Sequence, residues 1–228
     1  MHVKVIKNDP KLILEEIKKE TPIIVFRKFL NPNDCKKIIN ICHKNNAYKD
    51  HRKLKVNKYF NFHSIDVLPS NASSNRIFRT FELSNFFIKK FKSIRYAISF
   101  QDKIIKKDNK KIFRKVQVIH YPVGGGFFEE HTHNRYPTNY GMIVTLSKKN
   151  KDFKEGVTTF RVRDKNIELE KYQITVGDLI LFKFDLPHSI TKCDPKEDLK
   201  FDTKGRWTLI FPAMYQKKFK EIVKTQKN

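Results

Sequence analysis

The second half of the sequence is a series of short segments with the patterns of β-strands, and this series limits the fold more than any other feature. Period-two alternation is clear in KVQVIHY (115–121), whereas DLILF (178–182) and WTLIF (207–211) are continuous apolar runs typical of buried strands. Many short strands in succession predict an antiparallel barrel or a double sheet. We expect the strands at residues 112–121, 127–133, 140–147, 157–163, 171–175, 178–184, 187–192 and 206–213.

The first part of the chain has the spacing of helices instead. Residues 9–20 and 31–45 each begin with Asp or Asn followed by Pro, which is a start signal of helices, and each carries apolar residues at helical intervals. The β-branched and aromatic segment at 21–30 predicts a short strand between them. The pattern therefore predicts a strand flanked by two helices.

Two further segments complete this part of the chain. Residues 46–80 are polar and rich in turn residues, and they predict a long excursion of a functional or mobile kind. Residues 83–98 return to helical spacing. They carry an aromatic and aliphatic stripe that we expect in the core, formed by Phe86, Phe87, Phe91 and Ile94.

Helices first and strands afterwards predict an α+β protein, mainly β, in which N-terminal helices pack on the strands. At 228 residues the chain has the length of one well-filled domain. We expect a single domain over 1–228, with a helical and variable part at 1–110, a β core at 111–214 and a helix or tail at 215–228.

The formal net charge of +24 would attract nucleic acid or another polyanion. The Lys residues are spread along the whole chain, however, which favours a solvated surface over a nucleic-acid site. No apolar run approaches the roughly 20 residues of a membrane span, and the opening MHVKVIKNDPK has no apolar signal core. With three Cys, which we expect to be reduced and buried, the sequence predicts a cytoplasmic protein with no membrane partner.

Two of the eight His lie in the string HTH at the end of an alternating strand. His131 and His133 are two residues apart, so their side chains face the same side and can converge on one ion. A third, His188, follows another strand in DLPHSI. A His pair with a distant His binds one face of a metal and leaves other positions open for substrate and oxygen, so these three residues form a candidate metal site.

Five segments occur in the order seen in the prolyl-hydroxylase-like branch of the Fe(II)/2-oxoglutarate dioxygenases. They are YPVGGGFFEEHTH (121–133), GVTTF (156–160), ITVGDLILF (174–182), LPHSI (186–190) and GRWTLIF (205–211). The segment IIVFRKFLNPNDCKKII also resembles the entry segment of that family, so the similarity covers roughly residues 22–213. This resemblance implies a double-stranded β-helix, or jelly roll, with Fe(II) as the metal and 2-oxoglutarate as co-substrate.

The resemblance also implies roles for single residues. His131 and His188 take the places of two metal ligands, and Tyr121 stands where related enzymes have a Tyr that reaches the 2-oxoglutarate carboxylate. Arg206 would hold this carboxylate, because its planar fork suits bidentate pairing and its charge is permanent near neutral pH. Thr208, two residues further along the same strand face, would add a hydroxyl hydrogen bond. No catalytic side chain is expected beyond the metal site.

The sequence departs from the family at position 133, where the family has a carboxylate and this chain has His. Three interpretations stand: three neutral imidazoles bind the metal, a carboxylate comes from Glu129, Glu130 or Asp185, or the site is inactive. We favour the three-His site, because a neutral imidazole is a competent ligand of first-row metals. An inactive site would have no need of a metal-binding residue at this position. A neutral ligand in place of a carboxylate also makes the site more positive, which strengthens its attraction for dianionic 2-oxoglutarate.

The leading hypothesis is an Fe(II)/2-oxoglutarate hydroxylase that acts on a protein side chain, a peptide or a free amino acid, as similar enzymes do. One alternative is a three-His dioxygenase of a small molecule that does not use 2-oxoglutarate, and the expected roles of Arg206 and Tyr121 argue against it. The other alternative is a basic nucleic-acid-binding protein with an inactive barrel. The nucleic-acid demethylase branch of the family carries a second Arg six residues after the first, and Pro212 occupies that position here, so this branch is disfavoured.

Overall fold

The computed structural model of the chain describes residues 2–7, 9–44, 60–61, 63–64, 85–105, 112–114, 116–133, 138–200 and 202–215. Most of the excursion expected at 46–80, and all but the first residue of the helix or tail expected at 215–228, lie outside these residues. The excursion is described at two short strands, β3 (Phe60–Asn61) and β4 (His63–Ser64). Each of them pairs with a strand of the β core.

Seven strands form the larger of two main sheets, in the order β1-β2-β11-β8-β13-β6-β4. The pair β1 and β2 is parallel, and the other neighbours are antiparallel. The two N-terminal strands therefore extend a sheet whose centre comes from the β core. Besides β4, the strands are β1 (Val3–Lys7), β2 (Ile23–Arg27), β6 (Gln117–Tyr121), β8 (Tyr140–Thr145), β11 (Leu179–Lys183) and β13 (Arg206–Ile210).

The smaller main sheet has five strands in the order β10-β9-β12-β7-β3, and all its neighbours are antiparallel. A separate two-stranded ribbon joins β5 (Ile112–Arg114) to β14 (Ala213–Tyr215). Besides β3, the strands of the smaller sheet are β7 (Gly126–His131), β9 (Thr158–Val162), β10 (Lys165–Glu168) and β12 (His188–Cys193).

Helices come before the β core in the chain, as the sequence predicts. Asp9 Oδ1 accepts a hydrogen bond from the Lys11 N–H at 2.9 Å, and Asn31 Oδ1 accepts one from the Asn33 N–H at 2.8 Å. Each bond satisfies an N–H group that has no partner within its own helix. The helices are α1 (Pro10–Lys18), α2 (Pro32–Lys44), a short segment at 85–90 and α4 (Lys92–Ile104).

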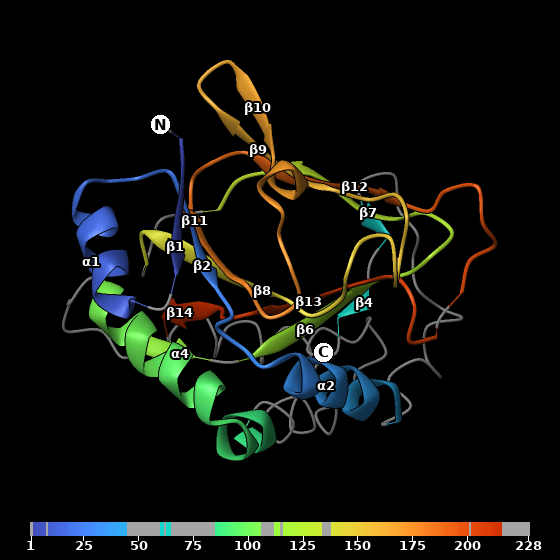
Figure 1. The fold of residues 1–228 in the computed structure, drawn as a ribbon, viewed down its shortest axis with the longest axis horizontal. Helices are drawn as coiled ribbons and strands as arrows, with labels where there is room; N and C mark the ends of the chain where they lie inside the picture. Colours follow the sequence, from blue (N-terminus) through green and yellow to red (C-terminus); the bar gives the residue numbers. More distant parts are fainter. Residues whose placement is uncertain are drawn as a thin grey trace, which may run out of the picture.

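The helices lie on one side of the larger sheet, and the smaller sheet lies on the other (Figure 1). Because successive strand residues point to opposite faces, Leu179 and Leu181 of β11 join the core under the helices, whereas Ile180 and Phe182 face the smaller sheet. Phe160 of β9 packs there, with its ring centre 5.0 Å from that of Phe182. Burial of each such side chain stabilises the fold by about 1.5–3 kcal/mol, so apolar packing holds both faces of the larger sheet.

The strand expected at 171–175 is wrong. This region holds the short 3-10 helix η2 (Leu169–Tyr172) followed by a turn, whereas strand β10 lies just before it. Gln173 has a left-handed backbone with φ of 55°, which interrupts an extended chain. The Asp178 carboxylate then accepts a hydrogen bond from the Thr175 N–H at 2.9 Å, so the segment bonds locally instead of to a strand.

The core stripe expected at 83–98 is correct at three of its four positions. Phe87, Phe91 and Ile94 are buried, but Phe86 is 42% exposed. The helix is interrupted at Phe91, which has an extended backbone, before α4 begins at Lys92. Phe87, Phe91 and Ile94 nevertheless keep the i, i+4, i+7 spacing of one buried stripe, and Phe86 lies one position to the side of it.

Two strand expectations also need correction. The strand expected at 112–121 is divided into β5 and β6, which belong to different sheets, and β1 was not expected at all. At the coarser level, the expected mainly β fold with few helices is confirmed. Within the described part of the chain, every helix falls short of the length and apolar character that crossing a membrane requires.

Candidate metal centre

Three His side chains meet where β7 and β11 end and β12 begins. His131 is the last residue of β7 and pairs with His188, the first residue of β12. His133 lies two residues past the end of β7, and its backbone N–H donates to the Phe184 carbonyl at 3.1 Å. This bond holds the chain after β7 beside the end of β11, which brings the third imidazole to the other two.

The ligand nitrogens of His131, His133 and His188 all lie within 4.8 Å of one another. The ring centre of His131 lies 4.8 Å from that of His133 and 4.3 Å from that of His188. A first-row metal binds an imidazole nitrogen at about 2.1 Å, so nitrogens around one ion lie up to about 4.2 Å apart. Small side-chain rotations would therefore place all three around a single ion.

Two of the imidazoles are oriented by backbone carbonyls two residues before them. His131 Nδ1 lies 2.8 Å from the Glu129 carbonyl, and His188 Nδ1 lies 2.8 Å from the Leu186 carbonyl. Since a carbonyl only accepts, each Nδ1 carries the proton, and each Nε2 is left with a free lone pair. This second contact is the one that metal-binding His residues usually make, and it fixes the ring for binding through Nε2.

Aromatic rings surround the three imidazoles. Phe128 stacks on His131 with 3.8 Å between ring centres, and Phe184 lies 4.6 Å from His133. Burial lowers the pKa of His131, and burial together with the neighbouring His131 lowers the pKa of His133 to about 4 and that of His188 to about 3. The imidazoles are therefore neutral near pH 7, the form that binds a metal.

The carboxylates considered as alternative ligands do not belong to the metal-spaced group among the described residues. Glu129 and Glu130 are exposed, and Glu130 forms an ion pair with Arg161 at 2.6 Å on the outside of the smaller sheet. Asp185 lies in the turn between β11 and β12. Across the described residues, the group with metal-ligand spacing consists of the three His and contains none of these carboxylates.

The other predicted site residues lie together on the inner face of the larger sheet. Trp207 belongs to the core under the helices, so its strand neighbours Arg206 and Thr208 face the space between the sheets. Arg206 is paired with Tyr121 in β6, and Thr208 is paired with Thr145 in β8. All four polar residues are buried, and the Arg206 charge lowers the pKa of Tyr121 against the larger, raising effect of burial. The structure thus brings Tyr121, Arg206 and Thr208 into one cluster.

The Arg206 side chain has a partner that the sequence did not predict. Its Nη1 donates to Glu170 Oε1 at 2.6 Å and to the Gly156 carbonyl at 3.2 Å, and its Nη2 donates to Thr158 Oγ1. Glu170 belongs to η2, in a polar stretch without a recognisable motif, so no local signal marks it. Arg206 Nε is buried and has no hydrogen-bond partner within the described residues.

The distance between the His group and Arg206 suits a short dicarboxylate. Phe160 pairs with His188 across β9 and β12, and Thr158, which contacts Arg206, lies two residues and so about 7 Å along the same face of β9. The buried Thr145 hydroxyl also lacks a partner among the residues that the structure describes. The His group, the free Arg206 Nε and this hydroxyl are what a five-carbon 2-oxo dicarboxylate would need, so the residues fit 2-oxoglutarate.

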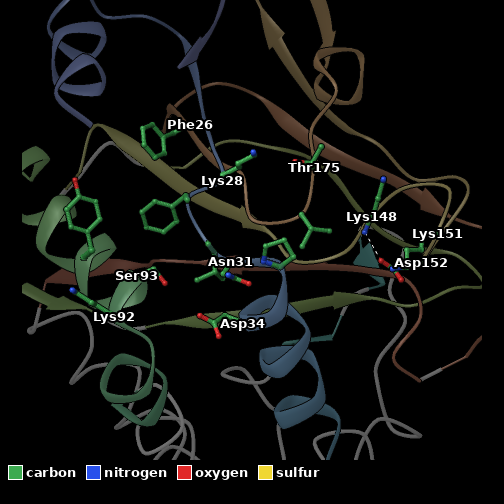
Figure 2. A pocket seen from close by; sticks show the side chains of 15 residues that line it. Phe26, Lys28, Asn31, Asp34, Lys92, Ser93, Lys148, Lys151, Asp152 and Thr175 are labelled. Carbon is green, nitrogen blue, oxygen red and sulfur yellow. Dashed lines mark hydrogen bonds between the residues drawn. The ribbon is translucent and has the colours of Figure 1, made fainter. Parts of the chain in front are cut away.

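A hollow lies outside the two sheets, beside helices α2 and α4, and has a volume of about 1070 Å³ (Figure 2). Its lining includes Lys28, Lys92, Lys148 and Lys151, and the Asp152 carboxylate accepts a hydrogen bond from the Lys148 N–H at 2.7 Å. None of the predicted site residues lines it. It is a basic surface hollow that is separate from the His group.

No protein-family model matches the sequence, and no curated protein matches it. The fold is similar to that of a prolyl-4-hydroxylase from Pseudomonas putida, with a TM-score of 0.53 and 15% identity over 88% of this chain and 95% of that one. It is also similar to a prolyl hydroxylase from Trichoplax adhaerens, solved in complex with a peptide fragment of the hypoxia inducible factor oxygen degradation domain. That match has a TM-score of 0.53 and 14% identity over 93% of this chain and 91% of that one. At these identities the likeness shows a shared fold and leaves the chemistry to the site itself.

Proposed function

We propose that this chain is an Fe(II)- and 2-oxoglutarate-dependent oxygenase whose two main sheets form a double-stranded β-helix, or jelly roll. One observation carries the proposal. Three neutral imidazoles with ligand nitrogens within 4.8 Å of one another lie in the same inter-sheet space as a buried Arg with a free N–H. The first group suits a metal ion, and the second suits the far carboxylate of a co-substrate that also reaches the metal.

The proposed roles follow the positions of the side chains. His131, His133 and His188 would hold Fe(II) through their ring nitrogens, while Arg206 would hold the distal carboxylate of 2-oxoglutarate. Tyr121 and Thr208 would add hydroxyl contacts, in line with their places on the same inner face. With both groups bound, iron would supply an oxidation by dioxygen, in which one oxygen atom enters the substrate and the other enters the succinate that forms, with CO2, from 2-oxoglutarate.

The surroundings of the site support an oxidation that must exclude water. Phe128, Phe160 and Phe184 contact the imidazoles and place apolar surface beside them. Gly141 lies on the inner face of β8, and an added Cβ there would lie 2.4 Å from the Phe182 ring. A larger residue at 141 would displace the Phe182 and Phe184 rings, so this glycine makes room for the aromatic side chains beside the His group.

The proposed substrate is a protein side chain, a peptide or a free amino acid, and the reaction is a hydroxylation. Two considerations support this class: the resemblance of the sequence segments to prolyl-hydroxylase-like enzymes, and the peptide complex of the structural neighbour from Trichoplax adhaerens. A peptide would approach the iron from the side that the three His leave open.

Anaerobic addition of Fe(II) and then 2-oxoglutarate tests the proposal. A weak visible charge-transfer band is expected when the co-substrate chelates the iron, and it should be absent with succinate, which lacks the 2-oxo group. His131→Ala provides the control, because it removes a ligand without touching the Arg206 cluster. Iron binding without the band would contradict the use of 2-oxoglutarate.

A three-His dioxygenase that does not use 2-oxoglutarate is the second candidate. The ion pair between Arg206 and Glu170 favours it, because this cation already has an internal carboxylate partner. The same titration separates the two, since this candidate predicts iron binding and no band. The third alternative, a basic nucleic-acid-binding protein with an inactive barrel, predicts no tight iron site at all.

A further inference from the structure

Glu170 places a negative charge inside the proposed co-substrate site. Its Oε1 lies 2.6 Å from Arg206 Nη1, and both of its carboxylate oxygens accept from the Thr158 N–H, at 3.2 and 3.1 Å. The Glu170 side chain is 15% exposed and the Arg206 side chain 4%. The ion pair is therefore largely shielded from water. Charges in such a place interact more strongly than charges on the surface.

The remaining hydrogen-bonding capacity of Arg206 has a definite geometry. The Gly156 carbonyl, Glu170 and the Thr158 hydroxyl take both N–H groups of Nη1 and one of Nη2. Among the residues that the structure describes, the Nε–H and the second Nη2–H have no partner, and these two nitrogens form the side edge of a guanidinium. A carboxylate can bind this edge with two parallel hydrogen bonds.

A co-substrate carboxylate on that edge would share Arg206 with Glu170. The two carboxylates would lie on different sides of one guanidinium and repel each other across it, because a single positive charge faces two negative ones. The attraction that Arg206 offers to a distal carboxylate is thereby reduced. The 2-oxo acid end is not affected in the same way, since it would bind at the His group.

We propose that Glu170 is a specificity-determining residue that competes with the distal carboxylate of the co-substrate for Arg206. The inference rests on the proposed use of a 2-oxo acid co-substrate. Its consequence is a weak requirement for the second carboxylate, so 2-oxo acids with an uncharged tail bind nearly as well as 2-oxoglutarate. In this respect the chain selects for the 2-oxo acid end of its co-substrate more than for the dicarboxylate.

The test measures binding of two acids that differ at the distal end alone, 2-oxoglutarate and 2-oxopentanoate, to the Fe(II)-loaded protein by anaerobic titration calorimetry. For the unaltered protein we expect the two dissociation constants to agree within about tenfold. In Glu170→Gln the constant for 2-oxoglutarate should fall by at least about tenfold, because a carboxylate close to the ligand has gone, while that for 2-oxopentanoate should change by less than about threefold.

Glu168→Gln is the matched control. Glu168 is two residues away, its side chain is 43% exposed, and it pairs with Lys171 at 3.6 Å. The Glu168→Gln substitution removes the same charge from the same segment without touching Arg206, so both dissociation constants should stay as in the unaltered protein. Circular dichroism and thermal unfolding show whether each variant is folded.

Three results would decide against the proposal or against its premise. A preference of the unaltered protein for 2-oxoglutarate above about 100-fold would overturn the proposal, and this measurement needs no variant to fold. A folded Glu170→Gln that binds 2-oxoglutarate no more tightly would also overturn it. If the iron-loaded protein binds neither acid, the proposed co-substrate is wrong and the role of Glu170 falls with it.

Discussion

Replacement of His133 by Ala is the most direct perturbation of the proposed three-His site. His131 and His188 are each held by a hydrogen bond from Nδ1 to a backbone carbonyl at 2.8 Å. His133 packs against the ring of Phe184 and lies outside both strands that carry the other ligands. The change therefore leaves the other two imidazoles and their supports in place and gives one ligand position to water.

The expected magnitude follows from the difference between a ligand and its support. Loss of a partner that only orients a ligand costs about 10–100-fold in metal affinity. Loss of His133 removes a metal–nitrogen bond itself, so we expect Fe(II) affinity to fall by at least about 100-fold, which corresponds to about 2.7 kcal/mol.

The assay is an anaerobic competition titration of Fe(II) between the protein and a chelator of known affinity. Glu130→Ala is the control, because Glu130 is exposed and paired with Arg161, and Asp185→Asn tests the remaining carboxylate; both should bind iron as the unaltered protein does. His133→Asp should also retain iron, while its added negative charge weakens 2-oxoglutarate binding. The reasoning is refuted if His133→Ala keeps Fe(II) affinity within about threefold while Asp185→Asn loses it.

Three further changes probe the co-substrate cluster, the inter-sheet core and one largely buried carboxylate. Arg206→Ala should keep iron but weaken 2-oxoglutarate binding at least about tenfold, since it removes the cation that separates the distal carboxylate from the Glu170 carboxylate and leaves the two negative charges facing each other; unchanged affinity in anaerobic calorimetry would remove Arg206 from the site. Phe160→Ala should lower the free energy of unfolding by about 3–5 kcal/mol in urea denaturation, because its fully buried ring packs between the sheets. Glu16 accepts hydrogen bonds from the Thr21 hydroxyl and then from Lys19, which lower its pKa. The unaltered protein should therefore be more stable than Glu16→Gln above about pH 5, and the difference should vanish as pH falls through the lowered pKa; a gap that persists at about pH 2 would contradict this.

Features with a short-range signal were predictable from the sequence. Asp9 and Asn31 mark helix starts because each is followed by Pro and an apolar pattern, and both side chains accept the expected hydrogen bonds. The placement of His131 and His133 together follows from their two-residue spacing near a strand end. His188 joins them through antiparallel pairing of β12 with β7, which the strand pattern made available but did not specify.

Features that depend on long-range contacts were not predictable. Glu170 meets Arg206 across 36 residues of sequence, and nothing in its own neighbourhood distinguishes it from the other surface acids. That the buried Thr145 hydroxyl has no hydrogen-bond partner among the described residues can be known only from the pairing of β8 with β13. Likewise, the segment of β1 has no turn signal linking it to β2, because parallel neighbours are joined through a helix and not a hairpin.

The order of strands leaves β1 at one end of the larger sheet and β10 at one end of the smaller sheet. A free strand edge presents unpaired backbone groups on which a second molecule can add its own strand. On β1 the exposed positions are Lys4 and Lys7, and on β10 they include Lys165. Desolvating these ammonium groups would oppose such an addition, so these Lys residues would disfavour association through the two strand ends of the described sheets. Neutral substitutions at these three positions would then expose both edges to self-association at high protein concentration.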